Sequence, residues 1–132
     1  MAVIIGIDHG TKHIGLAISD ETGLVAAPLD TITRTRNRQL EQQVAELINK
    51  KNLVVERFVI GDPLGLGGKP TQQSKLVKQF AENLQRLTGV PYTLWNETGS
   101  SFRAEQIDAD KIHEYSAVDI LQAYLDFKRS GI

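Results

Sequence analysis

The chain has 132 residues, which fits one domain, and its 41% hydrophobic and 23% charged residues are usual for a globular protein with a buried core. It has no cysteine, which excludes disulfides and thiolate metal sites, and no run reaches the roughly 18–20 apolar residues of a membrane span. The N-terminus lacks the pattern of a secretory signal, so a cytoplasmic protein is expected, and the net charge of −1 neither favours nor excludes a nucleic-acid partner.

The first half of the chain predicts strands around one helix. Three strand-like runs come first, in residues 3–8, 14–19 and 24–33. Turns at Gly10 and near Gly23 separate them. Apolar residues then recur on one face of a helical period across residues 40–48. A short run of continuous apolar character at residues 57–60 is typical of a strand that is covered on both faces.

A loop and a second helix follow. The density of Gly and Pro in residues 61–70 argues against regular structure there. Apolar residues return at helical spacing across residues 77–87, and either Thr71 or Ser74 can cap that helix. Gly89 is expected to end it.

The last part of the chain predicts a strand at residues 92–95 and a final helix whose apolar face spans residues 117–125. The order βββαβαβα favours an α/β layered fold. Asp8 and Glu97 lie at the carboxyl ends of two predicted strands, where open sheets collect their ligands. The pattern therefore predicts two acids at one crevice. The alternatives are a turn cap at Asp8 and a solvated strand-end acid at Glu97.

Four motifs run along nearly the whole chain. They read GIDHGTKHIGLAISD at residues 6–20, VIGDPL at 59–64, WNETGSS at 95–101 and AVDILQAYL at 117–125. Their order and spacing resemble the YqgF/RuvX family of pre-16S rRNA nucleases and Holliday-junction-resolvase-like proteins. The resemblance implies one RNase H-like nuclease domain over residues 1–132. Its α/β fold would have a five-stranded mixed sheet, with three antiparallel strands and then two parallel ones, flanked by helices.

The resemblance also implies phosphodiester hydrolysis that depends on Mg²⁺ or Mn²⁺ held by acids. Asp8 and Glu97 match the acids of the first and third motifs. The family's last acidic position is occupied here by His113, three residues after Asp110, so both can share one helical turn. An imidazole can bind metal or act as a base, so all four residues are predicted catalytic and metal-binding residues. The alternatives are a helix N-cap at Asp110 and an ordinary surface or half-buried histidine at His113.

Other positions concern how the protein would bind a substrate. The third motif has Asn-Glu-Thr at residues 96–98 where the family has Asp-Glu-Arg, and the stretch before the last helix is shorter than usual. Four basic residues are predicted to contact nucleic acid, with solvated surface charges as the alternative. These are Lys12, Arg34, Arg36 and Lys69. At Asp62 and Asp119 the family is apolar, and both a solvated acid and an extra ligand are open there.

The resemblance implies an endonuclease that matures the 5′ end of the 16S rRNA precursor in ribosome biogenesis. Structured RNA is the expected partner, with the protein a monomer or homodimer away from any membrane. One alternative is a resolvase-like nuclease on branched DNA, which needs two symmetric cuts and hence a dimer. Another is a nucleic-acid-binding relative without catalysis. The Asp-x-Gly-Thr at residues 8–11 also occurs in sugar kinases and actin-like ATPases, but their ATP cleft needs two such domains.

Overall fold

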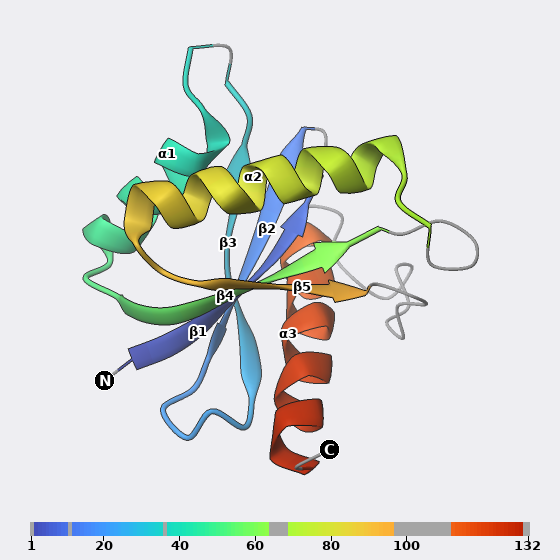
Figure 1. Cartoon of the computed structure of the whole chain (residues 1–132). Helices are drawn as coiled ribbons and strands as arrows, with labels where there is room; N and C mark the ends of the chain where they lie inside the picture. The colour runs from blue at the N-terminus through green and yellow to red at the C-terminus, as the bar shows by residue number, and fades with distance from the viewer. Residues whose placement is uncertain (1, 11, 36, 64–68, 97–111, 131–132) are drawn as a thin grey trace.

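Five strands form one mixed sheet in the order β3-β2-β1-β4-β5 (Figure 1). The structure, a computed structural model, describes residues 2–10, 12–35, 37–63, 69–96 and 112–130. The strands are β1 (Ala2–His9), β2 (His13–Ser19), β3 (Ala26–Thr33), β4 (Val54–Asp62) and β5 (Tyr92–Asn96). β1, β2 and β3 pair antiparallel, whereas β4 is parallel to both β1 and β5. The predicted sheet, with three antiparallel strands and then two parallel ones, is confirmed.

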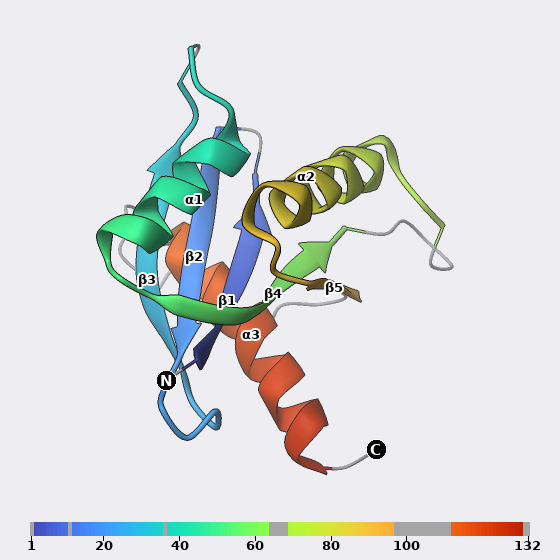
Figure 2. The same cartoon turned by 60° about the vertical axis from the view of Figure 1, so that its left-hand side comes forward.

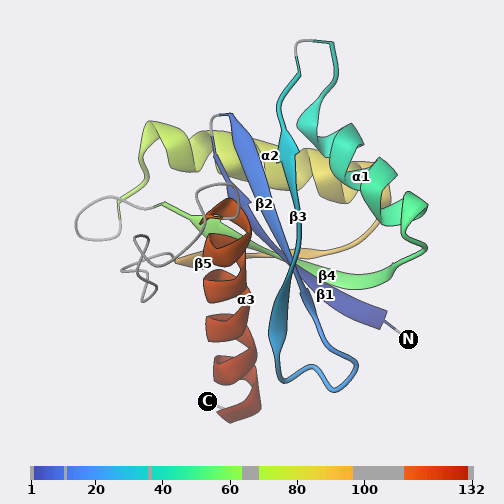
Figure 3. The same cartoon turned by 180° about the vertical axis from the view of Figure 1, so that it is seen from behind.

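The helices cover the two faces of this sheet. α1 (Leu40–Lys50) and α2 (Gln72–Thr88) lie on one face, and α3 (Ile112–Ser130) lies on the other (Figures 2 and 3). The core under α1 and α2 takes Ile5 and Ile7 of β1, whereas Ile4 joins the core under α3. Successive side chains of a strand point to opposite faces, so odd-numbered residues of β1 face α1 and α2 and even-numbered residues face α3.

α3 packs very close to the sheet at Gly6. A Cβ atom at this position would lie 2.6 Å from Cβ of Leu121 and 3.0 Å from the carbonyl oxygen of Ala117. Real Cβ atoms do not tolerate such contacts, so only glycine lets the helix lie directly on β1. Gly6 thereby fixes the position of α3 relative to Asp8, two residues further along the strand.

The predicted ends of α2 are confirmed. Thr71 is the N-cap: its hydroxyl oxygen accepts from the backbone N–H of Ser74 at 3.0 Å, while the Ser74 hydroxyl accepts from the backbone N–H of Thr71 at 2.7 Å. This reciprocal pair satisfies donors that the first turn would leave unpaired. At the other end Gly89 adopts a left-handed conformation with φ 74°, which glycine reaches without strain.

The predicted limits of two strands were wrong. β3 begins at Ala26 and not at residue 24, because the Asp20 carboxylate accepts from the backbone N–H groups of Leu24 and Val25 at 3.1 and 3.3 Å. These bonds hold the two residues in the turn. β4 spans Val54–Asp62 and not only residues 57–60, because Val54 and Val55 pair with β1, and Gly61 and Asp62 pair with β5.

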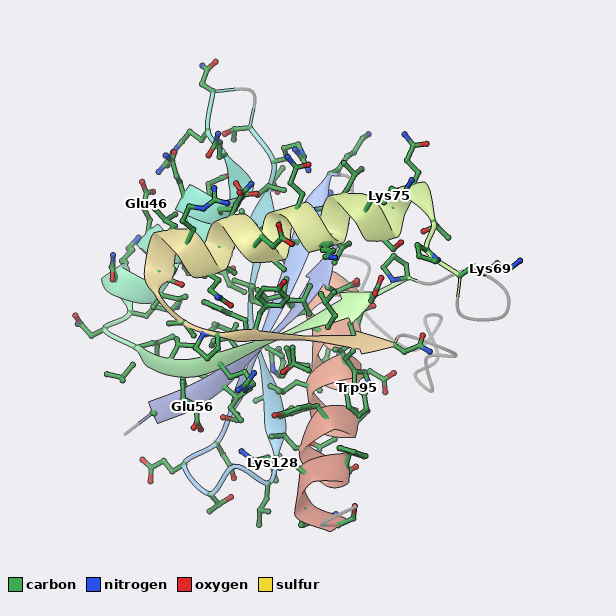
Figure 4. The ribbon with its side chains drawn as sticks, viewed as in Figure 1. Glu46, Glu56, Lys69, Lys75, Trp95 and Lys128 are labelled. Atoms are coloured by element: carbon green, nitrogen blue, oxygen red, sulfur yellow. The ribbon has the colours of Figure 1, made fainter. Side chains whose placement is uncertain are left out.

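Trp95 is partly buried and packs against the core under α3, beside this helix (Figure 4). Its ring lies 5.7 Å from that of Tyr124 and 5.5 Å from that of Phe127, in edge-on contacts. Within the described part of the chain, no helix has the length and apolar character needed to cross a membrane.

Candidate active site

The sheet topology brings the acidic and basic candidate residues together at one edge of the sheet. β1, β4 and β5 are parallel, so their carboxyl ends meet there, and the start of β2 and the end of β3 join them because those strands run antiparallel. We call this the carboxyl edge. Asp8 lies there near the end of β1 and Asp62 at the end of β4. Lys12 and Arg34 are brought together by the bond from the backbone N–H of Arg34 to the carbonyl of Lys12, at 2.8 Å.

Asp8 is half-buried and faces α3. Three glycines surround its position on that face. Gly6 precedes it by two residues, Gly15 is its register partner on β2, and Gly61 follows Ile60, the partner of Ile7 on β4. α3 already fills the space over Gly6, whereas Gly15 and Gly61 carry no side chain that could compete for the space around the carboxylate. We call Gly15 and Gly61 the glycine cradle.

His13 shares this face of the sheet with Asp8. It lies two residues before Gly15 on β2, diagonal to Asp8 across the ladder, and it is half-buried. Its Nδ1 lies 3.2 Å from the hydroxyl oxygen of Thr33, within hydrogen-bond distance. Sequence reasoning did not select His13 as a candidate. The alternation of residues along a strand, counted from Asp8 through the turn, is the signal that could have found it.

His9 directly follows Asp8 but faces the other side of the sheet. Its ring centroid lies 4.8 Å from that of Phe80 on α2, and Gln73 Nε2 donates to its carbonyl oxygen at 3.4 Å. Burial and, less strongly, the positive charge of Arg34 lower the pKa of His9, which favours the neutral ring. His9 was also not selected from the sequence.

Asp62 shares the carboxyl edge with Asp8 but lies on the opposite face. Phe58 and Ile60 belong to the core under α1 and α2, and alternation along β4 places Asp62 on that same side. One of its carboxylate oxygens is buried and accepts no hydrogen bond from the described residues, and burial raises the pKa of Asp62. Alternation therefore separates the two carboxylates across the sheet.

Most of the predicted ligand set lies outside the described residues. Glu97 and Asp110 fall there, and so does the side chain of His113, whose backbone lies in the first turn of α3. Glu97 directly follows Asn96, the last residue of β5. In the portion of the chain that is described, no three His, Asp or Glu side chains gather as a metal-binding group.

The predicted nucleic-acid contacts lie partly at this edge. Lys12 and Arg34 are exposed there, and Lys69 is exposed beyond β4, whereas Arg36 falls outside the described residues. Figure 4 shows Lys69 and Lys75 at the end of the molecule toward which β4 and β5 point. These cations surround the edge that carries Asp8. Asp119, on α3, is half-buried.

Comparison with known sequences identifies relatives over almost the whole chain. A family model described as "RuvX: Holliday junction resolvase" matches residues 2–127. A "Putative pre-16S rRNA nuclease" of Lachnospira eligens is 32% identical, covering 96% of this chain and 98% of its own length. Another of the same name, from Protochlamydia amoebophila, is 37% identical and covers 93% of this chain and 92% of its own.

Solved structures support the same fold. RuvC of T. thermophilus in complex with Holliday junction substrate has a TM-score of 0.65 at 15% identity, covering 99% of this chain and 97% of its own. The fowlpox virus Holliday junction resolvase has a TM-score of 0.57 at 14% identity, covering 95% and 99%. With an RNase H-like sheet, and a family model and relatives that span nearly its full length, the chain belongs to the RuvX family of Holliday-junction-resolvase-like nucleases.

Proposed function

We propose that this protein is a divalent-metal-dependent endonuclease that cleaves the precursor of 16S rRNA near its 5′ end. It would act in the cytoplasm as a single domain of residues 1–132. The observation that carries this proposal is Asp8, a half-buried carboxylate in a glycine cradle at the carboxyl edge. Relatives named as pre-16S rRNA nucleases support the choice of substrate.

The donor chemistry at the edge fits Mg²⁺ or Mn²⁺. Mg²⁺ takes hard oxygen ligands and keeps several waters, so few carboxylates suffice, and neither Gly15 nor Gly61 carries a side chain that would exclude a hydrated ion beside Asp8. The proposed ligands are Asp8, Glu97, Asp110 and His113. When bound, such an ion activates water and stabilises the charge that develops on a cleaved phosphodiester.

Basic side chains of the protein would bind and orient the nucleic-acid strand. Lys12, Arg34 and Lys69 are exposed around the carboxyl edge, and we assign them, with Arg36, to phosphate oxygens. Such contacts fix the register of a nucleic acid without reading its sequence. They would hold one phosphodiester over the glycine cradle while the Asp8 carboxylate stays fixed by the β1 ladder.

A second candidate is cleavage of branched DNA. The fold similarity to T. thermophilus RuvC favours it. Resolution of a four-way junction requires two symmetric cuts and therefore a dimer, so a protein that stays monomeric at working concentration would disfavour this candidate.

A side-by-side cleavage assay separates the candidates. Purified protein is incubated with Mg²⁺ or Mn²⁺ and either 16S precursor RNA or a four-way DNA junction. We expect cleavage of the RNA, loss of that cleavage in EDTA, and slower or no cutting of the junction. Faster cutting of the junction would favour the resolvase. Binding of both substrates without cleavage of either would identify a non-catalytic relative.

A further inference from the structure

A cavity lies on the face of the sheet opposite to Asp8, between α1 and α2. It has a volume of about 570 Å³, within the range of small-molecule sites. Four side-chain amides line it, and we call it the amide pocket; they belong to Gln39, Gln73, Gln79 and Asn83. Leu40, Leu76 and Phe80 supply its apolar surface, and His9, Arg34 and Glu41 complete the lining.

The lining selects a polar but uncharged group. Arg34 and Glu41 bring opposite charges, so the pocket has no excess of cations to attract a bare anion. Its amides each offer two donors and an acceptor. The side chains of Gln39 and Gln79 make no hydrogen bond to any described residue, so both are available to a ligand. Amides beside an apolar wall are the groups that read the edge and cover the face of a nucleobase.

The pocket lies directly across β1 from the proposed cleavage site. His9 lines the pocket and is the next residue after Asp8, but alternation turns the two side chains to opposite faces. Arg34 links the two regions, since it lines the pocket and also lies at the carboxyl edge beside Lys12. A nucleic-acid strand with one phosphodiester at Asp8 would reach the pocket by crossing the carboxyl edge.

We propose that the amide pocket binds one unpaired nucleobase of the nucleic acid, next to the phosphodiester at Asp8. This rests on the proposed function, because it makes the pocket part of the same substrate path. The base must be unpaired, since pairing would occupy the edge that the amides bind and stacking would cover its faces. The protein would therefore prefer cleavage sites that lie beside single-stranded nucleotides.

The test measures binding without cleavage, so that it does not depend on catalysis. Fluorescence anisotropy without divalent metal compares a labelled single-stranded RNA hexanucleotide with a chain of the same six phosphates that lacks bases. The parent is expected to bind the base-bearing probe about 5- to 150-fold more tightly, the range that contacts to one base give. Gln79→Ala should weaken that probe about three- to tenfold, by loss of a hydrogen bond, and leave the abasic probe unchanged.

Gln85→Ala is the matched control, because Gln85 is exposed on the same helix and does not line the pocket. Alanine favours helix, so neither variant should lose α2, and thermal unfolding checks this. Equal binding of both probes by the parent, or equal effects of the two variants, would overturn the proposal, as would no binding. Tighter binding of a nucleoside monophosphate than of the hexanucleotide would identify a free-nucleotide site instead. A parent that binds bases through Gln79 but cuts nothing would refute only the proposed function.

Discussion

Asp8→Asn is expected to lower metal-dependent cleavage of the precursor RNA by at least about a hundredfold. The substitution keeps the size of the side chain but removes the negative charge that holds the cation. Bound metal stabilises phosphodiester cleavage by several kcal/mol, and each 1.4 kcal/mol corresponds to a tenfold change in rate. The measurement is the single-turnover rate with saturating enzyme, in Mg²⁺ and in Mn²⁺.

Asp126→Asn provides the matched control for that assay. Asp126 is exposed near the C-terminal end of α3, where it forms an ion pair with Arg129. An exposed pair of this kind contributes little to stability, so the variant should fold and cleave like the parent. If Asp8→Asn cleaved as fast as Asp126→Asn, Asp8 would have no part in catalysis.

Gly6→Ala is expected to destabilise the fold by about 3 kcal/mol, at the upper end of the range for overpacking. The added methyl would meet Cβ of Leu121 and the carbonyl oxygen of Ala117, neither of which is the free end of a flexible side chain. Relief therefore requires α3 to move off the sheet. Urea unfolding followed by circular dichroism measures the loss.

Gly23→Ala separates the effect of the close approach from the general cost of replacing glycine. Gly23 has φ 73°, but a Cβ there would have nothing within 4 Å. Only backbone strain opposes this substitution, at about 1 kcal/mol. A loss at Gly6 that is no larger than the loss at Gly23 would show that α3 does not rest on β1 as described.

Local sequence patterns predicted most of the fold, because each helix or strand has its own spacing of apolar residues and its own residues that end it. α2 begins after Thr71 and ends before Gly89, as expected, because helix caps depend on neighbouring backbone groups. The end of β4 was missed because Gly61 and Asp62 resemble a turn when considered locally, and only pairing with β5 keeps them in the sheet. Contacts between distant segments override local preference at such positions.

The position of Asp8 at the end of a strand was predictable, but the face of the sheet that it presents was not. The sequence locates Asp8 at the end of a strand, and the sheet confirms that position. Which face a strand-end residue presents depends on the register between strands, so the separation of Asp8 from His9 and Asp62 required the cores on both faces. The amide pocket was not predictable, because α1 and α2 bring its residues together from distant parts of the chain.

Calorimetric titration of the protein with Mn²⁺ tests the central claim most directly, since it needs neither substrate nor turnover. The parent and Asp126→Asn should show the same saturable binding. Asp8→Asn should weaken it about tenfold or more, because the loss of a ligand should cost at least as much as the loss of an outer-shell group, which costs about 10–100-fold. Equal Mn²⁺ affinity in the parent and in Asp8→Asn would contradict the assignment of Asp8 as a metal ligand.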